Sequence, residues 1–244
     1  MARISYDETT AAGYKAVREL PREGLADWRD AVERHLRPTP GMTLVDIGAG
    51  TGQFSSALGD WFDIDVIAVE PSEAMRARIP RTPRIEPREG EATSLPLADE
   101  SVDAAWMSLV IHHVADLEAA AREIRRVLRP GAPVLIRQGF TGRCAGIELV
   151  RWFPETERTI DTYPSVDDVC RAFATAGFRQ DALEPVCELR PPAPLADLLV
   201  EVDTLRQADT SMRSLSEDEF LRGRERLRAA TEPRSNWLDL LVLR

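Results

Sequence analysis

Three glycines that follow a short apolar run are the residues of this chain best suited to approach a ligand. Residues 43 to 47 are β-forming, and Gly48, Gly50 and Gly52 come next at every second position. An amphipathic pattern begins directly after them, so we expect a strand, a tight turn and a helix. Glycine permits positive φ and close approach of a ligand, and a helix start offers free N–H groups and a positive dipole end. The segment therefore predicts a binding site.

The residues around this turn indicate which ligand it holds. Dinucleotide-binding folds carry G-x-G-x-x-G, whereas the spacing here is G-x-G-x-G and Asp46 stands two residues before the first glycine. An acid so close to the turn would repel a pyrophosphate. It suits a cationic or zwitterionic ligand, such as the amino-acid end of S-adenosylmethionine. A glycine-rich turn that binds nothing is the alternative.

A second acid, Glu70, closes the next expected strand, which covers residues 64 to 69. A carboxylate at this place can accept hydrogen bonds from both hydroxyls of a ribose, which every adenosine cofactor carries. A solvent-facing acid at a strand end is the alternative for Glu70 alone. Two acids and three glycines at this spacing favour a cofactor site.

With these motifs the chain resembles the class I S-adenosylmethionine-dependent methyltransferases, in the small-molecule branch around the ubiquinone and menaquinone biosynthesis enzymes. The resemblance covers roughly residues 40 to 190. Several ordered motifs carry it: Val45-Asp46-Ile47-Gly48-Ala49-Gly50-Thr51-Gly52, Val69-Glu70-Pro71-Ser72, Gly90-Glu91-Ala92 with Leu95-Pro96-Leu97, Val102-Asp103, and Leu128-Arg129-Pro130-Gly131. It implies S-adenosylmethionine as the cofactor.

The resemblance also implies which residues bind that cofactor. The acid and the glycine turn would hold the amino-acid portion, the second acid the ribose, and an acid and an amide further on the adenine. Glu91 stands where most relatives have Asp, and Met75 would cover one adenine face unless it only fills the core. The implied binding residues are Asp46, Gly48, Ala49, Gly50, Glu70, Pro71, Met75, Glu91, Ala92 and Ser108.

Catalytic candidates lie just past the fourth expected strand, at the switch point of the sheet where ligands bind. His112 and His113 stand there, and an imidazole can take a proton from an acceptor near neutral pH. His113 is the first candidate for a base and Tyr14 the second, because the family's leader often folds over the cofactor. Packing or cofactor contact is the alternative for the histidines. No third ligand at zinc-like spacing accompanies them, so we expect no metal.

Composition restricts the possible partners. The net charge is −10 and the isoelectric point about 5.0, which argues against a sequence-independent grip on nucleic acid. No apolar run reaches the ~20 residues of a membrane span, and the first residues lack the apolar core of a signal peptide. We therefore expect a cytoplasmic protein with a small-molecule substrate, no nucleic acid and no membrane partner. It would be a monomer or homodimer, and a partner subunit stays open.

The expected fold is α/β, a doubly wound, mostly parallel sheet of seven strands in the order 3-2-1-4-5-7-6. That order follows from the resemblance. Residues 1–244 would form a single domain. Within it, residues 1–40 would be N-terminal helices that close the cofactor site, and residues 139–164 and 191–233 would form a helical substrate lid.

The expected function is transfer of a methyl group to O, N or C of a small molecule, including acceptors of secondary metabolism. An alternative is a protein that binds the cofactor without transferring methyl, as a partner subunit or as a lyase or cyclase. A protein or RNA methyltransferase is opposed by the acidic charge and the lid, and the chain has no Asn/Asp-Pro-Pro-Tyr stretch. A dehydrogenase is opposed by the glycine spacing and by Asp46.

Overall fold

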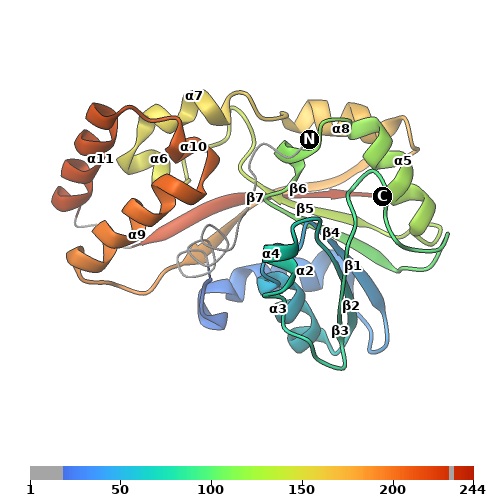
Figure 1. The fold of residues 1–244 in the computed structure, drawn as a ribbon. Coiled ribbons are helices and arrows are strands. Elements are labelled where there is room, and N and C mark those ends of the chain that lie inside the picture. Colours follow the sequence, from blue (N-terminus) through green and yellow to red (C-terminus); the bar gives the residue numbers. More distant parts are fainter. Residues whose placement is uncertain (1–18, 231–233) are drawn as a thin grey trace.

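The structure of the protein, a computed structural model, describes residues 19–230 and 234–244. Its centre is a seven-stranded sheet of order β3-β2-β1-β4-β5-β7-β6 (Figure 1). β7 is antiparallel to β5 and β6, and the other neighbouring strands are parallel. The strands are β1 (Thr43–Ile47), β2 (Asp65–Val69), β3 (Ile85–Arg88), β4 (Ala104–Ser108), β5 (Val134–Gln138), β6 (Gln180–Leu189) and β7 (Ser235–Leu243). The expected strand order is confirmed.

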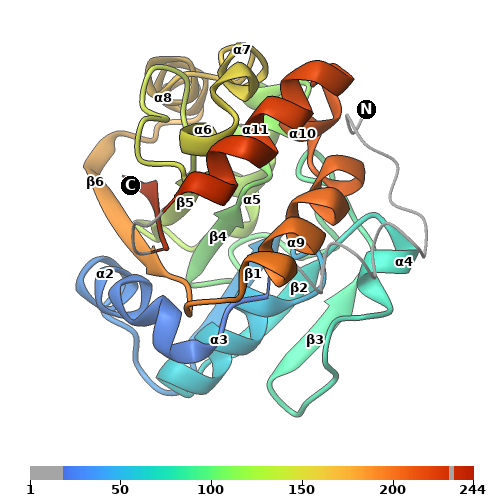
Figure 2. The same cartoon turned by 90° about the vertical axis from the view of Figure 1, so that its left-hand side faces the viewer.

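Helices cover both faces of this sheet and extend past the end where β6 and β7 project (Figures 1 and 2). α5 and α8 pack on one face, and α2 and α3 on the other. The helices are η1 (Arg22–Leu25), α2 (Ala26–Leu36), α3 (Gln53–Phe62), α4 (Glu73–Arg76), η2 (Ile111–His113), α5 (Leu117–Val127), α6 (Glu148–Trp152), η3 (Pro154–Thr156), α7 (Glu157–Ile160), α8 (Val166–Ala174), α9 (Leu195–Ala208), α10 (Thr210–Arg213) and α11 (Glu217–Ala229).

The alternation of side chains along β1 decides what each face of the sheet receives. Val45 and Ile47 join the core beneath α5 and α8. Leu44 joins the core beneath α2 and α3. Asp46 points to the same side as Leu44 and meets Ser55 in the first turn of α3. The strand therefore delivers the acid to the start of the first crossover helix.

Three helices begin at residues whose side chains cap the helix N-terminus. Asp116 caps α5 by accepting a hydrogen bond from the Ala119 N–H. Ser165 and Ser216 begin α8 and α11 with full capping boxes. Each box satisfies backbone donors that the helix itself cannot satisfy, so these helix starts follow from short stretches of sequence.

One strand runs further than its sequence pattern predicts. The apolar pattern of residues 133–136 predicts a strand of that length, but β5 continues through Arg137 and Gln138, which pair with β7 opposite Leu240 and Asp239. Both polar side chains are buried. The pairing partner lies about a hundred residues further along the chain, so the local apolar pattern could not reveal the extension.

The segments after β5 and after β6 form a helical cap with its own small core. Phe153 packs against Phe220, with ring centroids 5.6 Å apart, and the absence of a side chain at Gly223 leaves room for the Phe153 ring. α9 adds Val202 and Leu205 to the same cluster. The segment after β5 and the segment after β6, which are distant in the sequence, thus pack together into one helical cap. Within residues 19–230 and 234–244, no helix has the length and apolar composition that crossing a bilayer requires.

Candidate active site

The glycine turn has the backbone conformation that its residues predict. Gly48, Gly50 and Gly52 have φ of 71°, 57° and 84°, a region that side chains other than glycine rarely enter. The N–H groups of Gly48 and Ala49 donate to the Val69 carbonyl at 2.8 and 3.1 Å. These bonds hold the turn against the end of β2. A Cβ on Gly50 would meet no atom within 4 Å, so this side of the turn is open.

Gly48 and Gly41 form a natural test of how tightly this turn is packed. Both have positive φ, but a Cβ at Gly48 would lie 2.4 Å from Val110, whereas one at Gly41 would meet nothing within 4 Å. We expect Gly41→Ala to cost about 1 kcal/mol of unfolding free energy from backbone strain. Gly48→Ala should cost about 1–3 kcal/mol more, because Val110 must move. Urea unfolding of both variants measures the difference, and equal losses would show that the turn tolerates a side chain.

Asp46 is the most unusual acid of the site. It is 1% exposed, and its Oδ2 accepts a hydrogen bond from Ser55 Oγ at 2.5 Å. Its Oδ1 is buried and accepts no hydrogen bond from the residues that the structure describes. Burial, with a smaller contribution from the nearby Glu70, raises the pKa of Asp46 to about 7. Within residues 19–230 and 234–244, Asp46 Oδ1 is therefore a buried acceptor that lacks a donor.

Glu70 lies beside the turn at the end of β2, as expected, but its carboxylate bonds to the backbone. Oε2 accepts from the Gly50 N–H and Oε1 from the Ser72 N–H, both at 2.9 Å. Burial raises the pKa of Glu70 above its ordinary value, although these two N–H groups oppose the change. In this structure Glu70 ties the glycine turn to the start of α4, and its expected contact with a ribose stays a prediction.

The turn opens into a cleft with an empty volume of about 620 Å³. Five of the ten cofactor residues expected from the sequence line it, namely Asp46, Gly48, Ala49, Gly50 and Ser108. The other five are not on its wall. Pro71 and Glu91 are exposed, and Ala92 is half-buried. Met75 is buried, at 3% exposure.

Arg137 is a wall residue of this cleft that the sequence patterns did not reveal. Its Nη1 donates to Ser108 Oγ at 2.9 Å, and its Nε to Glu188 Oε1 at 2.8 Å. The guanidinium also lies 5.3 Å from the ring centroid of Trp28 and 5.0 Å from that of Phe54, within range of cation–π attraction. The only feature of the sequence that could have indicated Arg137 as a cleft residue is its position directly after an apolar strand, next to the switch point.

A second cavity, with an empty volume of about 900 Å³, lies between the sheet and the helical cap. The sheet side contributes His112, His113 and Gln138, and the cap contributes apolar side chains such as Leu205. The two cavities adjoin, because Arg190 and Leu109 line both of them.

The two histidines form part of an aromatic stack on the wall of this second cavity. The rings of His112 and Tyr163 are 4.2 Å apart and nearly parallel, at 22°. The His113 ring lies 4.1 Å from that of His112. Gln138 Oε1 lies 3.3 Å from His112 Nδ1. The structure thus brings both histidines to one cavity, while Tyr14 lies outside the described residues.

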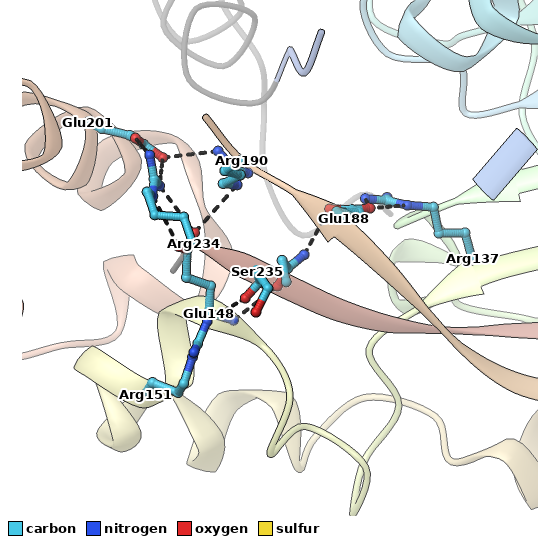
Figure 3. A network of polar contacts seen from close by, with 9 residues as sticks. Arg137, Glu148, Arg151, Glu188, Arg190, Glu201, Arg234 and Ser235 are labelled. Atoms are coloured by element: carbon cyan, nitrogen blue, oxygen red, sulfur yellow. Dashed lines mark hydrogen bonds and ion pairs between the residues drawn. The ribbon is translucent and has the colours of Figure 1, made fainter. Parts of the chain in front are cut away.

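A box of four charged side chains lies at another wall of this cavity, where Glu148, Arg190 and Glu201 line it (Figure 3). Arg234 makes two bonds to Glu148 and two to Glu201, all between 3.0 and 3.1 Å. Arg190 approaches the same two acids at 3.4 and 3.1 Å. Because Glu148 belongs to α6 and Glu201 to α9, the box fastens both halves of the cap to the chain that flanks β6 and β7.

Metal ligands do not gather at this site. In the described part of the chain, no three His, Cys, Asp or Glu side chains are placed to hold a metal ion. The site presents an acid at the glycine turn, an arginine in the cleft and imidazoles in the adjoining cavity.

Comparisons with known proteins agree with this arrangement. A family model described as "Methyltransferase domain" matches residues 45–136. The chain is 35% identical over 170 residues to a malonyl-[acyl-carrier protein] O-methyltransferase of Methylococcus capsulatus, covering 68% of this chain and 58% of that protein. It is 33% identical over 143 residues to the ubiquinone/menaquinone biosynthesis C-methyltransferase UbiE of Caulobacter vibrioides, covering 52% and 56%. The chain thus spans about half the length of the curated relatives that it matches.

The fold has a solved counterpart over nearly its full length. A protein described as a methyltransferase of an antibiotic biosynthesis pathway from Anabaena variabilis superposes with a TM-score of 0.72. It is 24% identical and covers 93% of this chain and 98% of its own. The strand order, the glycine turn and the matched segment agree. The chain therefore contains a methyltransferase domain at residues 45–136, and beyond that segment it is similar to methyltransferases in sequence and fold.

Proposed function

We propose that the chain transfers a methyl group from S-adenosylmethionine to a small molecule bound in the cavity beneath the cap. One observation carries this proposal: the cleft at the glycine turn and the cavity that contains His112 and His113 adjoin, with Arg190 and Leu109 on both walls. A donor in the cleft and an acceptor in the cavity would then face each other. Holding two reactants in line can supply most of the rate enhancement of such a transfer.

The cleft fits a positively charged cofactor. Asp46 Oδ1 is a buried acceptor without a donor among the described residues, so the ammonium group of the cofactor's amino-acid end would supply the donor that it lacks. The open side of Gly50 would let the ligand reach the backbone. Glu70 would hold the ribose, and Met75, Glu91 and Ala92 the adenine. When bound, S-adenosylmethionine supplies a methyl group that is already activated on sulfur.

The cap would act as a lid. Residues 139–164 and 191–233 would enclose the acceptor and exclude water, and residues 1–40, with Tyr14, would close the cofactor side. The box of Arg190, Arg234, Glu148 and Glu201 supports this proposal, because it joins the two cap segments at the cavity wall.

Calorimetric titration with S-adenosylmethionine and S-adenosylhomocysteine tests the cofactor, and transfer of labelled methyl to a panel of phenols, quinols, carboxylic acids and amines tests the reaction. We expect micromolar binding and label in at least one acceptor. Binding without transfer would favour a partner subunit, or a lyase or cyclase on this scaffold. Absence of binding would refute the methyltransferase proposal for this chain.

A further inference from the structure

The amide of Gln138 is held in one orientation by the backbone next to it. Gln138 is 1% exposed, at the end of β5. Its Nε2 donates to the Gly139 carbonyl at 3.1 Å, and its Oε1 faces His112 Nδ1 at 3.3 Å. A flipped amide would place its oxygen against the Gly139 oxygen, and two acceptors cannot bond to each other. The amide oxygen therefore has to face the imidazole.

This orientation determines where His112 carries its proton. A carbonyl oxygen only accepts hydrogen bonds, so His112 Nδ1 must donate to Gln138 Oε1. In a neutral imidazole one nitrogen is protonated and the other has the lone pair, and the hydrogen bond of one nitrogen selects the tautomer. The lone pair of neutral His112 is therefore on Nε2. Stacking on Tyr163 at 4.2 Å restricts rotation of the ring.

We propose that His112 Nε2 is the general base for an acceptor that carries an acidic hydroxyl, a phenol or an enol, and that Gln138 is its positioning residue. This inference rests on the proposed methyl transfer. The hydroxyl proton passes to Nε2, the oxygen forms its bond to the methyl carbon, and the S–CH₃ electron pair stays on sulfur. The imidazolium then returns its proton to water, so charge and atoms balance.

The chemistry of the cavity selects this class of acceptor. An imidazole changes its charge near neutral pH, and transfer works best to a base whose pKa is near the operating pH and not far below that of the acid. Phenols and enols meet this condition, whereas aliphatic alcohols are far too weak as acids. The cap lines the cavity with Leu149, Ile160 and Leu205, and the flat stack of His112 and Tyr163 suits a planar ring. The sequence analysis placed His113 first as the candidate base, but it is His112 that contacts the fixed amide of Gln138.

The tautomer can be measured on the protein alone. The chain has three histidines, so long-range proton–nitrogen correlation spectra of ¹⁵N-labelled protein at pH 8 resolve each ring, with His112→Ala and His35→Asn used for assignment. We expect the Nδ1–H form for His112. Gln138→Met, which keeps the volume but loses the acceptor, should shift His112 toward the Nε2–H form that free histidine prefers. Gln138→Glu should retain Nδ1–H and raise the pKa of His112, because a carboxylate stabilises imidazolium.

An Nε2–H form of His112 in the unaltered protein would overturn the inference. Because this spectrum is recorded on the unaltered protein, it tests the proposed tautomer even if Gln138→Met fails to fold.

Activity is measured with catechol, 2-naphthol and 1,3-cyclohexanedione as hydroxyl probes and benzylamine as the amine probe. We expect His112→Ala to lower kcat for the hydroxyl probes about 100- to 10,000-fold with cofactor affinity retained. His113→Ala should lose less, and His35→Asn, remote on α2, should lose nothing.

The pH profile separates a base from a structural residue. The acidic limb of kcat should move to higher pH in Gln138→Glu, in step with the His112 titration seen by NMR. Methyl transfer that does not depend on His112, or transfer to benzylamine alone, would refute the base while leaving the proposed function intact. If the protein neither bound the cofactor nor transferred methyl to any probe, the proposed function itself would be refuted. The NMR spectra would still show which tautomer His112 adopts.

Discussion

Asp46→Asn is expected to weaken S-adenosylmethionine binding about 10- to 100-fold. In the unaltered protein the buried Oδ1, which lacks a donor among the described residues, would meet a cationic group, and bonds to charged groups contribute about 1.5–3 kcal/mol. Asparagine keeps the shape but has no charge, and it can direct an N–H toward the cation. Calorimetry measures the loss. Asp60→Asn, at an acid whose side chain is 71% exposed, is the control and should bind normally.

The same carboxylate makes binding and stability depend on pH in opposite ways. Burial raises the pKa of Asp46 from 3.8 to about 7, so the native ligand-free protein holds a proton that the unfolded chain has released. The unfolding free energy should therefore fall as pH rises from about 4 to about 7 and level off above that. Cofactor affinity should rise over the upper part of this window, because the ionised carboxylate binds the cation.

Asp46→Asn should remove the part of both trends that Asp46 causes, and leave the smaller part that comes from the raised pKa of Glu70. In the ligand-free state it should be more stable than the unaltered protein at pH 8, by up to about 4 kcal/mol, because no buried charge has to form. Thermal unfolding from pH 5 to 8 and titrations in buffers of different ionisation enthalpy provide the measurements. An unchanged affinity in Asp46→Asn would refute the role of this acid in the cofactor site.

Glu188→Met is expected to lower the unfolding free energy by about 3–5 kcal/mol. Glu188 is 1% exposed and bonds to Arg137 and to the Asn236 amide, so its removal leaves a buried guanidinium without its carboxylate. Urea unfolding measures the loss. Glu118→Met is the control, because the Glu118–Arg122 pair is exposed and 3.7 Å long and should contribute less than about 1 kcal/mol.

A double-variant cycle separates the pair from its parts. Adding Arg137→Met to Glu188→Met should recover most of the lost stability, since replacing a buried ion pair by apolar residues is often neutral. Burial alone would raise the pKa of Glu188, but Arg137 and Asn236 hold it below its usual value. The stabilisation by Glu188 is therefore present above its unfolded pKa and lost as pH falls through the lower native pKa. Additive losses in the double variant would contradict this account.

Short-range features of the site could be predicted because a few neighbouring residues determine them. The strand, the three-glycine turn with positive φ and the helix start follow from residues 43–55 alone, and capping boxes such as that of Ser165 need only four residues. The acid at the end of β2 could also be located. The strand order and the adenine contacts, such as those of Glu91 and Ala92, came from the resemblance. The structure places Asp46 and the glycine turn in the cleft.

Contacts that form only on folding decided the rest. Arg137 and Glu188 are separated by 51 positions, and His112 and Gln138 by 26, so no local pattern relates them. β5 reaches Gln138 because β7 pairs with it, and that pairing buries Arg137 and orients the imidazole. The cavity that contains the histidines exists only where two distant insertions pack together. The sequence by itself thus determined where a cofactor turn lies, because backbone conformation is local. The tertiary structure decided the charges and proton positions of the site, because burial and hydrogen-bond partners depend on distant strands.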